Sequence, residues 1–166
     1  IENNNSKFFI HYKIKNLLKD LNKTPGSYLL TGGTDLALEV TKKRKNLKNI
    51  FYLGSNDELN YINIKNNNIH IGAATPINDI IPILEKYYPN FSKMFERYGS
   101  EQIRNTASLG GNIGSASPIG DSLPVLMSLD GKLITEGRVK KLISFDNFFI
   151  DYRKTKLGKK EIVKEI

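Results

Sequence analysis

Residues 29–36 read Leu29-Leu30-Thr31-Gly32-Gly33-Thr34-Asp35-Leu36. They lie between a β-prone run at residues 27–31 and a helical pattern at residues 36–41, so the local order is strand, turn, helix. Paired glycines at such a turn expose backbone N–H groups, which together with the helix N-terminus attract phosphate. The stretch has neither the G-x-G-x-x-G spacing nor the Lys-Ser/Thr pair of the common nucleotide-binding templates. Taken alone, it is equally a tight turn with Thr34 or Asp35 as the N-cap of the helix.

A second stretch rich in small polar residues follows later in the chain. Residues 102–113 read Gln-Ile-Arg-Asn-Thr-Ala-Ser-Leu-Gly-Gly-Asn-Ile, and residues 114–121 read Gly-Ser-Ala-Ser-Pro-Ile-Gly-Asp. Regular periodicity disappears between residues 99 and 121, so we expect a long loop, and loops of that length are usually functional. Small residues let a backbone approach a ligand closely, while hydroxyl and amide groups supply hydrogen-bond donors. Two such loops, one from each half of the chain, predict a clamp around a diphosphate.

The first half predicts an α/β unit, which we place at about residues 7–75. A strand at residues 8–10 precedes a helix whose Ile14, Leu17, Leu18 and Leu21 share one face. A buried strand is expected at residues 50–53. Residues 62–64 and 69–71 then alternate around an Asn-Asn-Asn tip, which indicates a hairpin.

The second half, residues 76–166, predicts another lobe of the same domain. Prolines at positions 76 and 89 are typical of helix starts. A short helix is expected at residues 124–129, and strands are expected at residues 132–135, 139–143 and 148–150. The fold class is therefore α+β, with residues 1–166 forming a single domain of two lobes.

The amino-acid composition excludes several classes of functional site. The 166 residues contain no cysteine, which excludes disulfides and a Cys-ligated metal or iron–sulfur site in this stretch. His11 and His70 have no acidic residues spaced for metal binding, so we expect no metal site. No apolar run approaches the roughly 20 residues of a membrane-spanning helix, and no secretory signal is visible. The expected location is the cytoplasm.

The net charge of +8 favours polyanions in general. Its one dense run, residues 42–45, lacks interleaved aromatic side chains that could stack on bases. We interpret this run as a solvated helix end and expect no nucleic-acid partner, although a docking role for a basic interaction module without cofactor stays open.

The two loops together closely resemble the FAD domain of the xanthine dehydrogenase family of molybdenum hydroxylases. The segment from Phe148 to Thr155, Phe-Phe-Ile-Asp-Tyr-Arg-Lys-Thr, is similar to a segment that follows the flavin loops in that family. The paired glycines at positions 32 and 33 resemble the pattern found in bacterial small subunits of this family. One departure is the short stretch from Thr135 to Arg138, where relatives usually have a longer hairpin.

The resemblance implies a two-lobed, PCMH-type (vanillyl-alcohol-oxidase-like) fold with FAD extended between the lobes, and no acid–base catalytic residue. The positions that would contact FAD are Leu29, Thr31, Gly32, Gly33, Thr34, Asp35, Leu36, Tyr98, Ala107, Ser108, Gly111, Asn112, Ser115, Asp121 and Val163. Tyr152 matches a position that relatives bring toward the nicotinamide side.

The resemblance also implies partners. Flanking iron–sulfur and C-terminal domains are expected outside these residues, and the first residue is Ile rather than Met, so upstream sequence is expected as well. The 2Fe–2S clusters and a molybdopterin-binding large subunit would complete a hetero-oligomer that passes electrons from the flavin to NAD+. The alternative is the FAD-binding medium subunit of a carbon monoxide or aldehyde-type dehydrogenase.

Overall fold

The computed structural model describes residues 2–3 and 6–166, and it contains helices and strands throughout. The first sheet has four strands in the order β1-β2-β4-β3. Both β2 and β3 run parallel to β4, whereas β1 is antiparallel to β2. These strands are β1 (Glu2–Asn3), β2 (Ser6–Ile10), β3 (Ser27–Leu30) and β4 (Asn49–Tyr52). The strands expected at residues 8–10, 27–31 and 50–53 are confirmed.

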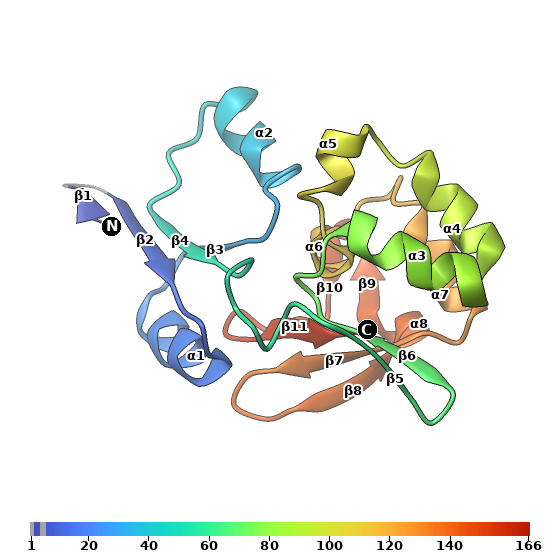
Figure 1. Ribbon diagram of the computed structural model, residues 1–166. Coiled ribbons are helices and arrows are strands. Elements are labelled where there is room, and N and C mark those ends of the chain that lie inside the picture. Colours follow the sequence, from blue (N-terminus) through green and yellow to red (C-terminus); the bar gives the residue numbers. More distant parts are fainter. Residues whose placement is uncertain (1, 4–5) are drawn as a thin grey trace.

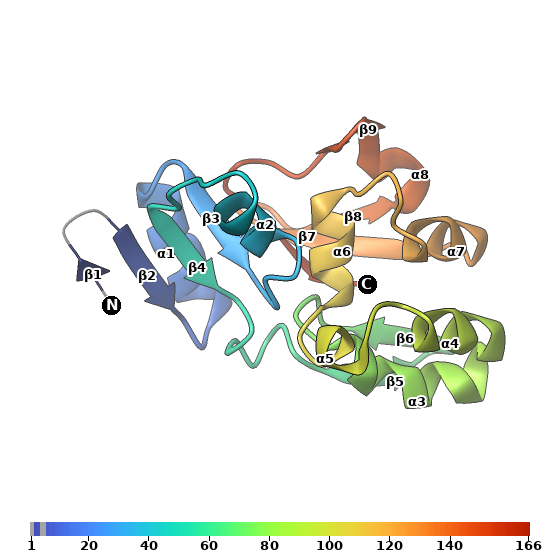
Figure 2. The same ribbon diagram turned by 90° about the horizontal axis from the view of Figure 1, so that it is seen from above.

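Two helices connect the parallel strands. In α1 (Ile14–Lys23), the buried residues are Ile14, Leu17, Leu18 and Leu21, so the predicted apolar face is confirmed. In α2 (Leu36–Thr41) no residue is buried. The two helices lie on opposite sides of the sheet (Figures 1 and 2). The helix α2 therefore contributes little to the core.

The predicted hairpin is formed by β5 (Ile62–Lys65) and β6 (Asn68–Ile71), which are antiparallel. Asn66 and Asn67 occupy its tip with φ of 51° and 59°. Asparagine tolerates this left-handed region better than most residues, and two such residues in succession match the twist of a tight hairpin.

The rest of the chain builds a helical layer and a second sheet. The helices α3 (Ile77–Tyr87) and α4 (Pro89–Glu96) begin at or just after the predicted prolines. Next come α7 (Ser122–Ser128), β7 (Lys132–Glu136) and β8 (Lys141–Ser144), and the chain ends with β11 (Ile162–Glu165). The second sheet is antiparallel in the order β11-β7-β8.

The prediction of a continuous loop between residues 99 and 121 was wrong. This segment contains α5 (Glu101–Arg104) and α6 (Leu109–Ser115). A serine caps each helix, because Ser100 Oγ accepts from the N–H of Ile103 and Ser108 Oγ accepts from the N–H of Gly111. The glycines of α6 allow close packing: a Cβ on Gly110 would lie 2.5 Å from the Cβ of Ala73. Packing therefore outweighs the low helix propensity of glycine.

The strand expected at residues 148–150 is confirmed with its bounds shifted by one residue, and a helical turn precedes it. The structure has a one-turn helix α8 (Phe145–Phe148), followed by β9 (Phe149–Asp151), which pairs with β10 (Lys154–Thr155). Phe145 and Phe148 are buried. A helical turn brings residues three positions apart to the same face, so both rings reach the core. In an extended chain, such residues point to opposite faces, and only one ring would be buried.

Buried apolar side chains form two clusters. One contains the apolar face of α1 with Phe51, Leu53, Leu59, Ala74 and Ile162. The other joins Ile71 and Ala73 to the helical layer and to Val163. Adjacent residues of β11 thus belong to different clusters, because successive side chains of a strand point to opposite faces.

The basic run at residues 42–45 is exposed and lies at the end of α2. Lys43 and Lys45 each place Nζ 2.5 Å from a carboxylate oxygen of Glu39. Hydrogen bonds from these two lysines lower the pKa of Glu39 to about 2. Within the described residues, no helix is long and apolar enough to cross a membrane.

Candidate functional site

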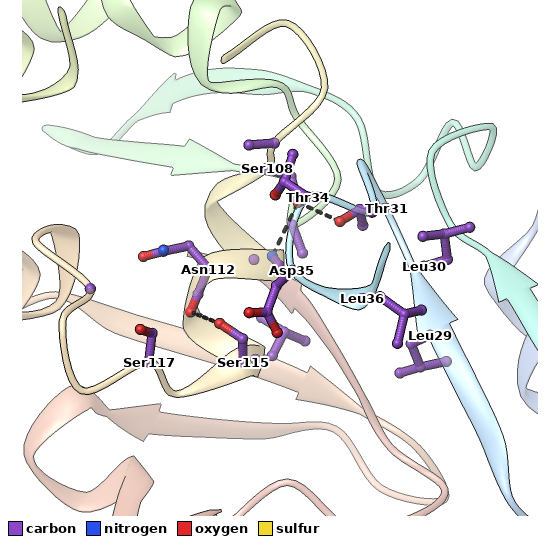
Figure 3. Close-up of a pocket in the computed structure, with 18 of the residues that line it drawn as sticks. Leu29, Leu30, Thr31, Thr34, Asp35, Leu36, Ser108, Asn112, Ser115 and Ser117 are labelled. Atoms are coloured by element: carbon purple, nitrogen blue, oxygen red, sulfur yellow. Dashed lines mark hydrogen bonds between the residues drawn. The ribbon is translucent and has the colours of Figure 1, made fainter. Parts of the chain in front are cut away.

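A pocket of about 570 Å³ lies between the β3–α2 turn and α6. Figure 3 shows Thr31, Thr34 and Asp35 from the turn facing Ser108, Asn112 and Ser115 from the α6 segment. Both predicted loops therefore meet at one cavity, although they are separated by more than 70 positions in the sequence. Its volume is in the range of about 300–1,000 Å³ that small-molecule sites usually have.

The two loops are directly hydrogen-bonded to each other. Ser108 Oγ donates to Thr31 Oγ1 at 3.0 Å and accepts from the N–H of Gly111 at 3.1 Å. Gly111 has no side chain to intrude here: a Cβ would lie 2.7 Å from Thr31 Oγ1 and 3.0 Å from Ser108 Oγ. One serine therefore caps α6 and joins it to the end of β3.

Three residues of the β3–α2 turn, Gly33, Thr34 and Asp35, line the pocket. Gly33 has φ of 73°, which is strained for any residue with a side chain. Asp35 is the N-cap residue of α2, but its carboxylate makes no capping hydrogen bond. Among the described residues, the N–H groups from Gly32 to Asp35 have no hydrogen-bond acceptor. These donors remain available to a ligand that carries oxygen atoms.

Gly32 has a different role from its neighbour. A Cβ at Gly32 would lie 1.8 Å from the carbonyl oxygen of Thr106 and 2.8 Å from the nitrogen of Ala107. The backbone of the turn therefore touches the backbone that leads into α6. Gly32 does not line the pocket; its lack of a side chain allows the two loops to approach.

The α6 side of the pocket carries a polar network. Asn112 Nδ2 donates to Tyr98 Oη at 3.1 Å, and Asn112 Oδ1 accepts from Ser122 Oγ at 2.5 Å. Ser115 Oγ donates to the carbonyl oxygen of Asn112 at 2.9 Å. The side chains at this end are consequently fixed in orientation before any ligand binds.

Tyr98 is half-buried beside this network. Burial raises the pKa of Tyr98, a change that the hydrogen bond from Asn112 opposes and that the negative charges of Asp121 and Asp35 reinforce. The hydroxyl therefore keeps its proton at neutral pH.

The pocket includes most of the residues that the sequence singled out. Those that line it are Leu29, Thr31, Gly33, Thr34, Asp35, Leu36, Tyr98, Ala107, Ser108, Gly111, Asn112, Ser115 and Val163. Gly32 and Asp121 do not line it. Tyr152 is 68% exposed on the turn between β9 and β10 and does not line it either.

The structure adds lining residues that the sequence reasoning missed. They are Leu30, Leu53, Ala73, Gly99, Ile103, Gly110, Gly114, Ser117, Ile119, Gly120 and Leu157. Several belong to the second loop, so their small size was a usable signal. Leu53, Ala73 and Leu157 come from other elements, and only the tertiary structure brings them to the cavity.

Metal-binding side chains do not gather in the described part of the chain, where no cluster of three His, Cys, Asp or Glu residues could hold an ion. Among the residues that the structure describes, Asp35 is the one carboxylate that lines the pocket. The site chemistry is thus mainly hydroxyl, amide and backbone N–H groups on apolar walls. Such groups can bind and orient an organic molecule.

Comparison with known proteins identifies relatives over nearly the whole chain. A protein-family model described as the FAD binding domain in molybdopterin dehydrogenase matches residues 4–166. Xanthine dehydrogenase 1 of Arabidopsis thaliana is 30% identical over 164 residues, covering 90% of this chain and 12% of that protein. The nicotinate dehydrogenase FAD-subunit of Eubacterium barkeri is 30% identical over 158 residues, covering 92% of this chain and 53% of that protein. The chain therefore spans about half the length of the FAD-subunit and a much smaller share of the xanthine dehydrogenase.

Solved structures agree on the fold. A chain of the carbon monoxide dehydrogenase from Hydrogenophaga pseudoflava superposes with a TM-score of 0.91 and 21% identity, covering 99% of this chain and 59% of that one. Quinoline 2-oxidoreductase from Pseudomonas putida 86 gives the same TM-score with 16% identity and the same coverage.

Proposed function

The chain belongs to the family of FAD-binding domains of molybdopterin dehydrogenases, and on this premise we propose that it carries electrons within a xanthine dehydrogenase-like molybdenum hydroxylase. The domain would receive them from 2Fe–2S clusters and pass them from reduced FAD to NAD+. The observation that carries this proposal is the pocket between the two hydrogen-bonded loops.

FAD would lie extended along this pocket in a two-lobed, PCMH-type arrangement. The two apolar clusters support two lobes, since Leu29 of β3 packs on one and Leu109 and Ile113 of α6 belong to the other. The lobes would comprise about residues 7–75 and 76–166, with two exceptions in packing: Ile71 and Ala73 belong to the cluster of the second lobe, and Ile162 belongs to that of the first. The thirteen predicted residues that line the pocket would contact the cofactor.

The residues present fit FAD chemically. The unpaired N–H groups of Gly33, Thr34 and Asp35, which line the pocket, suit the oxygen atoms of a diphosphate. The bare backbone at Gly111 leaves room beside Thr31 and Ser108 that a Cβ would fill. Apolar groups such as Leu29 and Val163 suit flat ring systems.

The domain would bind, orient and shield its cofactor rather than perform acid–base catalysis. FAD, when bound, supplies the redox chemistry, because it accepts and releases electrons without help from a reactive side chain. The hydroxyl and amide groups of the pocket would fix its position relative to the electron donor. Apolar lining residues such as Val163 and Leu157 would exclude water from part of the pocket.

Partner domains would supply the other centres. The chain contains no cysteine, so the thiolate ligands of a 2Fe–2S cluster would belong to an iron–sulfur domain. Oxidation of the substrate would take place in a molybdopterin-binding large subunit. The domain is accordingly one component of a hetero-oligomer.

NAD+ as the acceptor rests on the segment around Tyr152. This tyrosine is exposed and does not line the pocket, so it is accessible to a second molecule.

Asp121 is also exposed, at the start of α7, and would contact FAD only from outside the cavity wall.

A second candidate is the FAD subunit of a dehydrogenase with another substrate. The chain is 30% identical both to a nicotinate dehydrogenase FAD-subunit and to a xanthine dehydrogenase. Sequence identity therefore favours the two candidates equally. Both candidates share the FAD site and differ in substrate and acceptor. An interaction module without cofactor is disfavoured by the family match and by the open pocket.

The visible absorption spectrum of the purified chain tests FAD binding. We expect a flavin spectrum, or its appearance on addition of FAD, with FAD identified after heat release. A colourless chain that also fails to bind added FAD would overturn the proposal.

The acceptor is tested with the FAD-loaded chain. Addition of NADH under anaerobic conditions should bleach the flavin if nicotinamide exchanges electrons with it. Bleaching by a chemical reductant but not by NADH would reject NAD+ and favour another acceptor.

A further inference from the structure

The three parallel strands of the first sheet are apolar on both faces. Each of them ends in three successive aliphatic or aromatic residues, at positions 8–10 in β2, 28–30 in β3 and 50–52 in β4. A strand with one face in water would alternate apolar and polar residues, whereas unbroken apolar runs are typical of parallel strands that are buried on both sides. The sequence of these strands therefore calls for a covering layer on each face of the sheet.

Only one of the two faces is covered by a tightly packed helix. The middle residues of the three runs pack with α1 in one buried cluster; they are Phe9, Leu29 and Phe51. Successive side chains of a strand point to opposite faces, so the flanking residues point to the other side of the sheet. We call these flanking residues the second face: Phe8, Ile10, Tyr28, Leu30, Ile50 and Tyr52. Among the described residues, neither buried cluster includes Ile10, Tyr28, Leu30, Ile50 or Tyr52.

The helix α2 lies on the side of the second face but does not seal it (Figures 1 and 2). No residue of α2 is buried. Leu38 and Val40 of this helix are 45% and 47% exposed, and Ile10 of the sheet is 43% exposed. Exposed apolar groups gathered on one side of a sheet are typical of an interaction surface.

The segment that joins α2 to β4 makes this side of the sheet strongly positive. Residues 39–48 contain five cations and one carboxylate, Glu39. Lys43 and Lys45 both bind Glu39, so its charge is already neutralised. Three exposed cations of the segment have no ion pair within the described residues; they are Lys42, Arg44 and Lys48.

This basic segment lies close to the second face. The pKa of Lys45 is raised mainly by its hydrogen bond to Glu39, with a smaller contribution from Tyr28 of the second face. The same side of the sheet also borders the pocket, because Leu30 at the end of β3 and Leu36 at the start of α2 both line it. A molecule bound on the second face would therefore lie beside the pocket.

We propose that the second face, together with Leu38 and Val40 of α2, is the docking surface for an acidic and apolar segment of a partner protein. Apolar side chains of that segment would cover the sheet, and its carboxylates would pair with Lys42, Arg44 and Lys48. A second copy of this chain does not fit, because it would bring the same unpaired cations against one another. The inference goes beyond the proposed function and does not require FAD.

The test is the Kd of the full chain for a fluorescein-labelled helical peptide in which a stripe of leucines is flanked by glutamates, measured by fluorescence anisotropy. Two further peptides of the same length serve as controls: one with lysine in place of each glutamate, and one of glutamate alone. We expect the leucine–glutamate peptide to bind more tightly than either control, because it matches both the apolar face and the charge.

Variants of the chain place the peptide on the surface. Ile10→Ser should raise the Kd about three- to tenfold, since less apolar area is buried. Lys48→Glu should also raise it and should reduce its dependence on salt. The matched controls are Leu142→Ser on β8 and Lys159→Glu before β11, both at exposed positions outside the first sheet. Their Kd should equal that of the parent chain.

Several outcomes would overturn the inference. Equal binding of the glutamate-only peptide, or equal weakening by the control variants, would mean that charge alone explains the binding. Tighter binding to phosphatidylglycerol vesicles or to single-stranded DNA would replace the protein partner by a membrane or a nucleic acid. No binding of the leucine–glutamate peptide would also reject the docking surface. FAD binding is measured separately and stands or fails independently of these results.

A measurement on the unmodified chain covers the case in which a variant does not fold. During titration with the leucine–glutamate peptide, the NMR signals of the Ile10 methyl groups and of the Tyr28 and Tyr52 rings should shift, whereas those of Leu142 should not. Shifts confined to residues outside the second face and α2 would contradict the proposal.

Discussion

The hydroxyl oxygens of Thr31 and Ser108 lie 3.0 Å apart in a hydrogen bond that joins the end of β3 to the start of α6. The two residues are 77 positions apart in the sequence. Each belongs to a glycine-containing loop, and the pocket lies where these loops meet. This contact makes the two loops one site.

Ser108→Ala removes both the contact to Thr31 and the cap of α6. We expect the free energy of unfolding to fall by about 1–2 kcal/mol, since a lost N-cap typically costs about 1 kcal/mol and a hydrogen bond a similar amount. The Kd for FAD should rise as well. Ser128→Ala is the control, because that exposed serine bonds only within its own turn. Equal unfolding curves for the two variants would contradict the role of Ser108.

Gly111→Val should abolish FAD retention without unfolding the protein. The new Cβ would lie 2.7 Å from Thr31 Oγ1 and 3.0 Å from Ser108 Oγ, and both atoms are side-chain hydroxyls that can move. The added methyl groups would occupy the pocket. Circular dichroism should be unchanged while bound flavin, measured by absorbance, is lost. Retention of one FAD per chain would place the cofactor elsewhere.

Gly32→Ala should destabilise the fold rather than block the pocket. Its Cβ would lie 1.8 Å from a backbone carbonyl oxygen, so the two loops must separate. We expect a loss of about 3 kcal/mol, at the upper end of overpacking effects, measured by denaturant unfolding. Gly114→Ala is the stability control, because its Cβ would meet nothing within 4 Å. A Gly32→Ala chain as stable as Gly114→Ala would rule out this contact.

The stability of the fold should fall as the pH decreases through the titration of Glu165. Burial alone would raise the pKa of Glu165, but hydrogen bonds from Tyr61 and His70 outweigh it and hold the pKa below its usual value of 4.5. Because the pKa is lowered in the folded state, the stabilisation is present above 4.5 and is lost below it. Glu165→Gln should flatten the dependence of the unfolding temperature on pH in this acidic range. An unchanged slope would show that other carboxylates dominate.

Tyr152→Ala should leave the Kd for FAD unchanged, because this side chain is exposed and does not line the pocket. If Tyr152 borders the NAD+ site, the rate at which NADH bleaches the bound flavin should fall. Tyr87→Ala is a comparable exposed tyrosine on α3. Identical bleaching rates for the two variants would remove Tyr152 from the acceptor site.

The elements that the sequence predicted well are those with strong local signals. The face of α1, the Asn66-Asn67 hairpin tip and the start of α4 at Pro89 each depend on periodicity or backbone preference over a few residues. The resemblance of the two loops to xanthine dehydrogenase relatives is confirmed by the family match. Local chemistry and motif order were sufficient for these conclusions.

The errors occurred where packing overrides local preference. The helix α6 contains three glycines and was expected to be a loop, yet close contact with Ala73 and the Ser108 cap stabilise it. The helical turn α8, where no element was expected, likewise depends on packing, because it buries Phe145 and Phe148 together. Neither partner surface is visible in the sequence near these segments.

The sequence by itself determined which residues could recognise an organic cofactor: two groups of glycines, hydroxyls and amides, with no cysteine to hold a metal cluster. Only the tertiary structure decided that Thr31 and Ser108 touch, that Gly32 lets two backbones approach while Gly111 opens the pocket, and that Tyr152 does not line it. The physical reason is that residue type fixes chemical capacity, whereas distance and burial depend on how remote segments pack.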